Sequence, residues 1–221
     1  MNYKGLKQPL EIFSKYANVI SSSMDVKQLA INVQSVLDSL IEVEYNGLYF
    51  YDDQSQELKL LYAKNFNEEE LINAEKTAMD RHPGHVFRTK KHLLIKDTSK
   101  SKFSSSSKRS FKIFSRLYIP ILIEDKCVGT FGLASSEKNK FSDNDISVLY
   151  FIGSLAAMRY ISIQKELLNI QHLKENINLT SYLKKIEIFA STIQKSKSVD
   201  EIIWAVAKKA VAELGFNDCV I

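Results

Sequence analysis

In the middle of the chain, aliphatic residues recur at every second position of one stretch, and a second apolar stretch follows. The first covers residues 117–123 and the second residues 128–133, with a polar turn of Glu124, Asp125 and Lys126 between them. A period of two is typical of a strand with one buried face. The pattern therefore predicts an antiparallel hairpin, and helical spacing follows it from about residue 145.

The first 100 residues alternate between helical and strand periods. Apolar residues three or four apart predict helices at 10–20 and 26–41, with Asp25 available to cap the second helix. Strands are expected at 47–51, 58–63 and 92–96. The acidic start at Asn67 predicts a helix to about residue 79, and Pro83-Gly84 is expected to break it before a short turn or helix at 85–89.

After residue 145 the helical spacing continues for an unusual length. Apart from one longer step, apolar residues lie three or four apart from Val148 to Ile177, and no proline or glycine occurs between Gly153 and Gly215. This predicts a helix well beyond ordinary domain length. Residues 176–181 have low helix propensity, so a break or kink is expected there.

Two segments carry a resemblance to a known family. The second strand of the hairpin begins with Val128-Gly129, and Phe141-Ser-Asp-Asn-Asp145 then opens a helix. Upstream, Gly84-His-Val86 precedes an apolar strand that ends in Asp97. Together these features resemble the GAF domain, a sensor module of signalling proteins, over about residues 10–160. The resemblance implies an α+β fold, GAF-like and PAS-related, with an antiparallel sheet, helices on its faces and a long signalling helix after it.

The end of the chain echoes its beginning. Glu187-Ile-Phe189 repeats Glu11-Ile-Phe13. Each of these motifs is followed by a Ser-x-Asp segment, at residues 198–200 and 23–25, and then by an expected amphipathic helix. We therefore expect a sensory domain at 1–160, a helical linker at 161–185 and the truncated start of a second GAF-like domain at 186–221, within a longer protein. Chance similarity between two amphipathic helices is the alternative.

The composition is that of a globular protein without a membrane span. Of 221 residues, 45% are hydrophobic and 25% charged, no run of 18 consecutive apolar residues occurs, and the N-terminus lacks the apolar core of a signal peptide. A cytoplasmic location is therefore expected.

The basic character is local: residues 81–116 hold 11 Lys and Arg against one acid, leaving 19 basic and 25 acidic residues elsewhere. Within this region the Ser-rich segment 100–112 is predicted to be a mobile loop. Nucleic-acid binding by that loop is the less favoured reading.

Candidate ligand-binding residues cluster around the expected sheet face opposite the long helices. A concave site with several cations there favours a small anionic or polar ligand, and no cofactor is identified. Bulky side chains near the expected cavity, Tyr49, Phe66 and Tyr118, support the alternative of a dimerisation and relay scaffold without a ligand. The candidate ligand-binding residues are Tyr49, Arg81, His85, Arg88, Arg116, Tyr118 and Thr130.

Catalytic chemistry is not indicated. His82 and His85 are three apart, but no further ligand completes a metal site. His172 is followed by Leu-Lys-Glu rather than by the pattern of a phosphoacceptor histidine. Some proteins of the resembled family reduce free methionine sulfoxide with several cysteines, whereas this domain has only Cys127. Members of that family that bind cyclic nucleotides carry a motif with an asparagine and a glutamate. Both of these residues are replaced in this chain.

The resemblance implies a sensory module that signals to a downstream output domain such as a histidine kinase. We expect a homodimer through the N-terminal helix and the linker helix, because an exposed apolar stripe needs a partner. The stripe consists of Ile152, Leu155, Ile163, Leu167 and Ile170.

Overall fold

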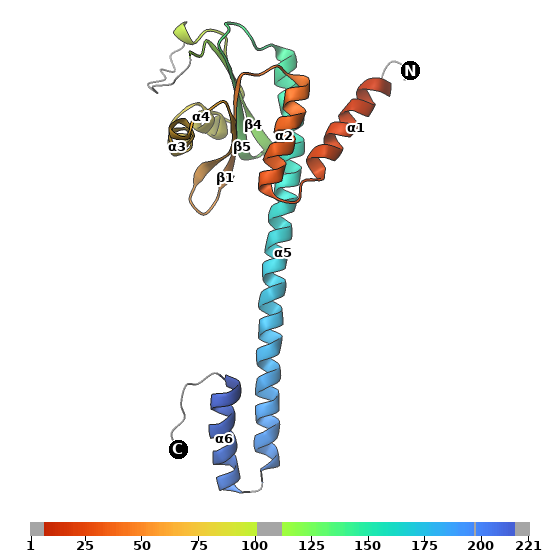
Figure 1. Cartoon of the computed structure of the whole chain (residues 1–221), viewed down its shortest axis with the longest axis vertical. Coiled ribbons are helices and arrows are strands. Elements are labelled where there is room, and N and C mark those ends of the chain that lie inside the picture. Colours follow the sequence, from red (N-terminus) through yellow and green to blue (C-terminus); the bar gives the residue numbers. More distant parts are fainter. Residues whose placement is uncertain (1–6, 101–111, 197, 215–221) are drawn as a thin grey trace. The chain divides into compact units, whose positions relative to one another are not determined.

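A computed structural model describes residues 7–100, 112–196 and 198–214 (Figure 1). The predicted mobile loop at 100–112 lies, except for its two end residues, outside the described residues. The chain divides into two compact units, Met1–Gln164 and Lys165–Ile221. The first unit holds the whole sheet and all the residues predicted to bind a ligand.

Five antiparallel strands form the sheet, in the spatial order β2-β1-β5-β4-β3. The predicted hairpin is confirmed as the pairing of β4 with β5, and the first two strands pair across the turn that follows Asp52. The α+β fold class is confirmed. The strands are β1 (Tyr45–Asp52), β2 (Glu57–Lys64), β3 (Leu93–Ile95), β4 (Ser115–Ile123) and β5 (Lys126–Ser135).

The first two helices begin and end where local signals place them. Helix α1 (Lys7–Ser21) is followed by α2 (Val26–Leu40), and the Asp25 carboxylate accepts a hydrogen bond from the Gln28 amide at 2.7 Å. That bond satisfies one of the amides that a helix start leaves without a partner. The predicted cap at Asp25 is therefore confirmed.

The helices between β2 and β3 differ in part from expectation. Helix α3 (Glu68–Lys76) begins with a capping box of Asn67 and Glu70, as its acidic start suggests, but ends three residues early. Pro83 and Gly84 do not break a helix; they lie in the first turn of α4 (His82–Thr89). The expected break was wrong, because a proline in the first helical turn removes no intrahelical hydrogen bond.

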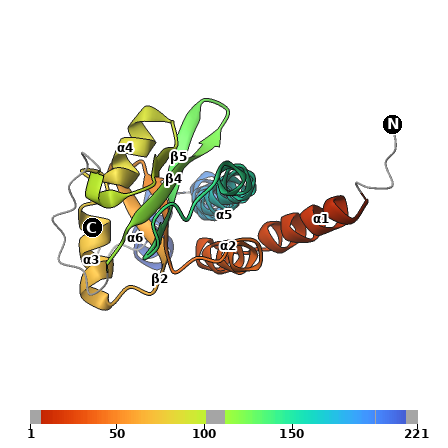
Figure 2. The same cartoon turned by 90° about the horizontal axis from the view of Figure 1, so that it is seen from above.

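The helices cover both faces of the sheet (Figure 2). Helices α2 and α5 (Asp143–Lys195) pack on one face around a large apolar core that includes Phe50, Phe131 and Leu149. Helices α3 and α4 lie on the other face, with α4 over β4 and β5 and α3 beside β2. A short 3-10 helix, η2 (Thr98–Lys100), follows β3.

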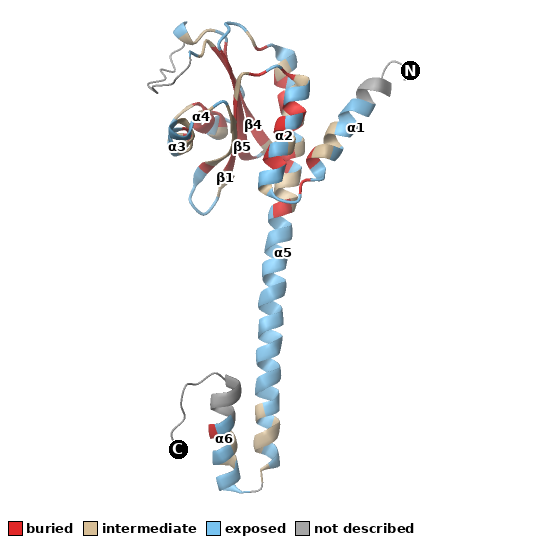
Figure 3. Cartoon of the chain, viewed as in Figure 1, coloured by how far each residue is buried: buried red, intermediate tan, exposed pale blue. Residues whose placement is uncertain are grey.

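Helix α5 is continuous for 53 residues and passes through 176–181, so the break expected there is absent. Its apolar stripe has two environments. Ile152 and Ile163 are buried in the first unit, which corrects the expectation that they need a partner, whereas Leu167 and Ile170 are more than half exposed (Figure 3). Helix α6 (Val199–Leu214) follows in the second unit.

Among the helices of the described segments, α5 meets the length and composition criteria for a membrane span. The stretch that qualifies contains polar residues, which is why no uninterrupted apolar run marks it in the sequence. Buried residues make up 39% of it. Core helices of soluble domains meet the same criteria, so this finding fits a core helix as well as a membrane-spanning helix.

Candidate functional site

Four of the predicted ligand-binding residues lie on one face of the sheet, beneath α4. Tyr49 of β1 pairs with Thr130 of β5, and Tyr118 and Arg116 follow at alternate positions of the neighbouring strand β4. Because side chains two apart in a strand point to the same face, the register gathers these four. All four are buried.

Two glycines make room for the tyrosine rings. A Cβ atom on Gly132 would lie 2.2 Å from Cε1 of Tyr118, so that ring lies directly against the glycine backbone. The atom nearest to a Cβ atom on Gly47 would be Cε2 of Tyr49, at 3.0 Å. Both aromatic side chains therefore lie flat along the sheet and fill space that larger neighbours would occupy.

His82 completes this group, and we call Tyr49, His82, Arg116, Tyr118 and Thr130 the polar layer. The His82 ring stacks on the Tyr118 ring at a centroid distance of 5.4 Å and an interplanar angle of 5°. Nη1 of Arg116 lies 3.4 Å from Nδ1 of His82. A guanidinium has no acceptor, so Nδ1 accepts in this contact and the imidazole is neutral, with its proton on Nε2.

Sequence reasoning weighed His82 as a metal ligand and, in preference, as a loop or pocket-wall residue, but did not include it among the candidate ligand-binding residues. A usable signal was present in the helical phase. His82 and the fully buried Val86 are four apart in α4, so both residues lie on the face that packs against the sheet.

The other three predicted residues lie outside the polar layer. Arg81 is the half-buried N-cap residue of α4, and its guanidinium donates to the Thr77 hydroxyl at 3.4 Å. His85 is half-buried in α4. Arg88 is exposed and donates to the Met79 carbonyl at 2.7 Å, which ties α4 to the end of the preceding segment.

Burial of polar groups distinguishes the layer from an ordinary core. The Arg116 side chain carries a positive charge at a position that is 3% exposed. Thr130 is 0% exposed, and its hydroxyl has no hydrogen-bond partner among the described residues. Buried polar groups are costly unless they are paired, so native proteins keep few of them without a reason.

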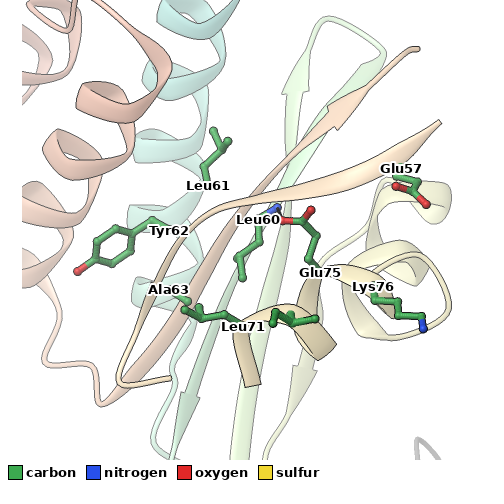
Figure 4. A pocket seen from close by; sticks show the side chains of 9 residues that line it. Glu57, Leu60, Leu61, Tyr62, Ala63, Leu71, Glu75 and Lys76 are labelled. Carbon is green, nitrogen blue, oxygen red and sulfur yellow. Dashed lines mark hydrogen bonds between the residues drawn. The ribbon is translucent and has the colours of Figure 1, made fainter. Parts of the chain in front are cut away.

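A separate open groove of about 630 Å³ lies at the β2 edge of the sheet (Figure 4). Leu60, Leu71 and Ile72 give it an apolar floor, and the Glu75 carboxylate accepts from the Leu60 amide at 3.1 Å. None of the seven predicted residues is among those that line it.

Cys127, the one cysteine within the sheet, is buried. Its thiol donates to the Gly129 carbonyl at 3.1 Å, and burial raises the pKa of the thiol. A buried thiol of raised pKa is a poor nucleophile, because the thiolate is the reactive form.

Comparisons with known proteins agree with this architecture. The model of the GAF domain family matches residues 23–158. No curated protein matches the chain. Similar solved structures are the GAF domain of an Acinetobacter phosphoenolpyruvate-protein phosphotransferase (17% identity, 72% of this chain and 96% of that one, TM-score 0.60) and the Neisseria meningitidis free methionine-R-sulfoxide reductase (16%, 71% and 90%, 0.57).

A third similar structure comes from Sinorhizobium meliloti, from a protein assigned as a candidate two-component sensor histidine kinase (13% identity, 67% of this chain and 99% of that one, TM-score 0.57). At such low identities these structures share a fold with this chain. The proteins from which these structures come have different activities, so function has to be argued from the site.

Proposed function

Since this chain belongs to the GAF domain family, we propose that its first unit is a non-catalytic sensory module that binds a small anionic molecule in the polar layer. The observation that carries the proposal is the buried combination of Arg116, His82 and Thr130. A guanidinium and a neutral imidazole protonated on Nε2 both present donors, so the layer favours a ligand rich in acceptors, such as a carboxylate.

The alternative is a relay scaffold without a ligand. It is favoured by the two tyrosine rings that lie against Gly47 and Gly132, because they occupy space next to the polar groups. Under the ligand proposal at least one ring moves aside on binding. Under the scaffold proposal both rings are permanent parts of the core.

Thermal shift against a panel of small organic acids tests the proposal, with Thr130→Val as the key variant. This substitution keeps the volume and removes a buried hydroxyl that has no partner, so the variant should be at least as stable as the parent. We expect an acid that raises the Tm of the parent to raise that of Thr130→Val clearly less.

The matched control is Thr192→Val, which makes the same change on α5 at a hydroxyl that bonds the Ile188 carbonyl of its own helix. It should keep the full shift. If Thr130→Val also keeps the full shift, the ligand binds elsewhere. If no acid on the panel shifts the parent, the scaffold proposal is favoured.

We further propose that the module acts as a homodimer whose linker helices pair. The support is the exposed apolar part of α5, where Leu167, Ile170, Leu173 and Ile177 are each more than half exposed. Spacings of three and four are those of helices that pair along a seam. An apolar stripe of this length in water is costly, and a second copy offers the same stripe.

Light scattering tests the dimer. Leu167→Glu places a charge in the stripe and should shift the chain toward monomer while the sheet stays folded. The control Asn169→Glu puts the same charge at an exposed position two residues on, close to the opposite face of the helix. A monomeric parent at tens of micromolar would contradict the relay proposal.

The output is proposed to be a downstream domain of the same protein in the cytoplasm, such as a histidine kinase. We also propose that 186–221 begins a second GAF-like unit. Its support is local: the Ser198 hydroxyl accepts from the Glu201 amide at the start of α6, three residues on, as Asp25 does for Gln28 at the start of α2. A reading frame that continues past Ile221 with strand patterns would support this, and a stop codon there would contradict it.

Reduction of free methionine sulfoxide is proposed to be absent. The similar fold of the Neisseria reductase makes the assay worthwhile, while the burial and raised thiol pKa of Cys127 argue against the activity. Turnover of free methionine-R-sulfoxide with a thiol reductant, lost in Cys127→Ser, would overturn this proposal.

A further inference from the structure

Strand β1 contacts both the polar layer and the long helix through two consecutive residues. Tyr49 belongs to the polar layer and packs with Leu58 and Ala78 on the α4 face. Phe50 lies in the core on the opposite face, where its ring stacks on Tyr160 of α5 at a centroid distance of 4.0 Å and an interplanar angle of 22°. Neighbouring residues of a strand move together, so a shift of one is felt by the other.

The ladder between β1 and β2 is irregular at this point. The register shifts between Leu48 and Tyr49, where β2 contains one extra residue. A bulge disrupts the pairing locally and increases the twist, so on its β2 side this part of β1 is less regularly paired than on its β5 side.

Tyr160 lies where α5 leaves the first unit, since the unit ends at Gln164. The preceding residue, Arg159, donates from Nε to the Ser23 carbonyl at 2.6 Å and from Nη1 to the Ser162 hydroxyl at 3.0 Å. Two consecutive residues of α5 thus hold the helix to two different elements, β1 and the turn between α1 and α2.

We propose that a structural change in the polar layer is transmitted to α5 through the Phe50–Tyr160 stack. Tyr49 is the residue that transmits this change from the polar layer to β1. This inference rests on the proposed function only in taking the polar layer as the regulated site. It requires neither an identified ligand nor a dimer.

The test perturbs the layer from within and reads the response at α5 by hydrogen exchange of the full chain. Gly47→Ala places a methyl group whose three nearest atoms all belong to the Tyr49 side chain, so it pushes first on that ring. We expect exchange in the α5 peptide that contains Tyr160 to change by about threefold or more, relative to an α2 peptide.

The same substitution is then made in a Phe50→Leu background, where the stack is lost and the response should vanish. Tyr160→Leu, at a half-buried helix position, serves as a second background if Phe50→Leu fails to fold. Gly132→Ala, on the β5 residue that pairs with Gly47, is the matched control. The atoms nearest to its methyl group belong to the Tyr118 ring of β4 rather than to Tyr49, so it should leave the Tyr160 peptide unchanged.

An unchanged peptide in Gly47→Ala, an equal response in both backgrounds, or an equal response to Gly132→Ala would each overturn the proposal. If the ligand proposal fails, no acid shifts the Tm of the parent, but Gly47→Ala still changes hydrogen exchange of the Tyr160 peptide. The two proposals can therefore fail independently.

Discussion

Gly84 offers a sharp test of the packing of α4, because replacing it with alanine should destabilise a helix that alanine would ordinarily favour. A Cβ atom there would lie 1.9 Å from the Met79 carbonyl oxygen and 2.4 Å from the carbon of that carbonyl. Both are backbone atoms, which no side-chain rotation can move. The Gly84 amide also donates to the Ala78 carbonyl at 2.9 Å, so the two segments are held together here.

The magnitude follows from two opposing effects. Alanine in a helix is favoured over glycine by at most about 1 kcal/mol. Ordinary contact begins at 3.4 Å, so the first turn of α4 must move about 1.5 Å from Met79, which breaks the Gly84 bond. Overpacking of this kind costs about 1–3 kcal/mol. The broken hydrogen bond costs about 1 kcal/mol more, which offsets the helix preference of alanine, so the net loss should be about 1–3 kcal/mol. For a chain of this size that is a fall in Tm of roughly 2–12 °C.

Gly153→Ala in α5 is the matched comparison. Its Cβ atom would meet Cδ1 of Ile119 at 3.1 Å, the far end of a flexible side chain, and Cγ1 of Ile121 at 3.8 Å. The side chain can yield by a few tenths of an ångström, so the helix preference of alanine should prevail. We expect this variant to equal the parent or exceed it by up to about 1 kcal/mol.

Thermal and urea unfolding followed by circular dichroism compare the three proteins, and hydrogen exchange locates the change. In Gly84→Ala the amide of residue 84, which bonds the Ala78 carbonyl in the parent, should lose protection first. The reasoning is refuted if Gly84→Ala is as stable as the parent with α4 still protected. A loss of stability in Gly153→Ala as large as that in Gly84→Ala would equally refute it.

Three further predictions concern other sites. The pKa of Asp97 is lowered from 3.8 to about 2 by hydrogen bonds from a lysine ammonium and a serine. The carboxylate therefore stabilises the fold above pH 4, and the stability difference between parent and Asp97→Asn should shrink in urea unfolding as pH falls from about 4 to about 2. Asn46→Ala should lower the unfolding free energy by about 1–3 kcal/mol, because it removes the 2.7 Å bond to buried Gln34, and adding Gln34→Met should recover part of the loss. In a Cys219→Ser background, Cys127 should react with a thiol reagent far more slowly in the folded than in the urea-unfolded protein, since burial raises its pKa; equal rates would contradict this.

Local signals in the sequence sufficed for much of the fold. The cap at Asp25, the capping box at Asn67 and the turn at Glu124-Asp125 act over three or four residues, so the chain itself specifies them. The alternating pattern of residues 117–123 likewise specifies a strand, but the prediction of a single buried face was wrong, because both faces of β4 are buried from Ser115 to Ile121. These elements were predictable because their stabilising contacts are close in sequence.

The start of α4 shows why other parts were not predictable. Pro83-Gly84 is a common helix-breaking pair, and the sequence alone does not distinguish a break from a first helical turn. The deciding contact is the approach of the Gly84 backbone to Met79, which exists only in the folded chain. The same reason hid His82, whose place in the polar layer depends on α4 lying over the sheet.

The α5 helix shows a limit of a different kind. Its apolar period predicts one buried face, and the face is present, but the period does not say what covers it. Ile163 is 2% exposed and Leu167 is 56% exposed, although the two are one helical turn apart on the same face. The face that packs into the sensory domain is therefore continuous with an exposed apolar face. In the proposed dimer, a rotation of the helix that changes pairing at Leu167 would also change the packing of Ile163, and this continuity is a physical reason for such a module to respond at one end to a change at the other.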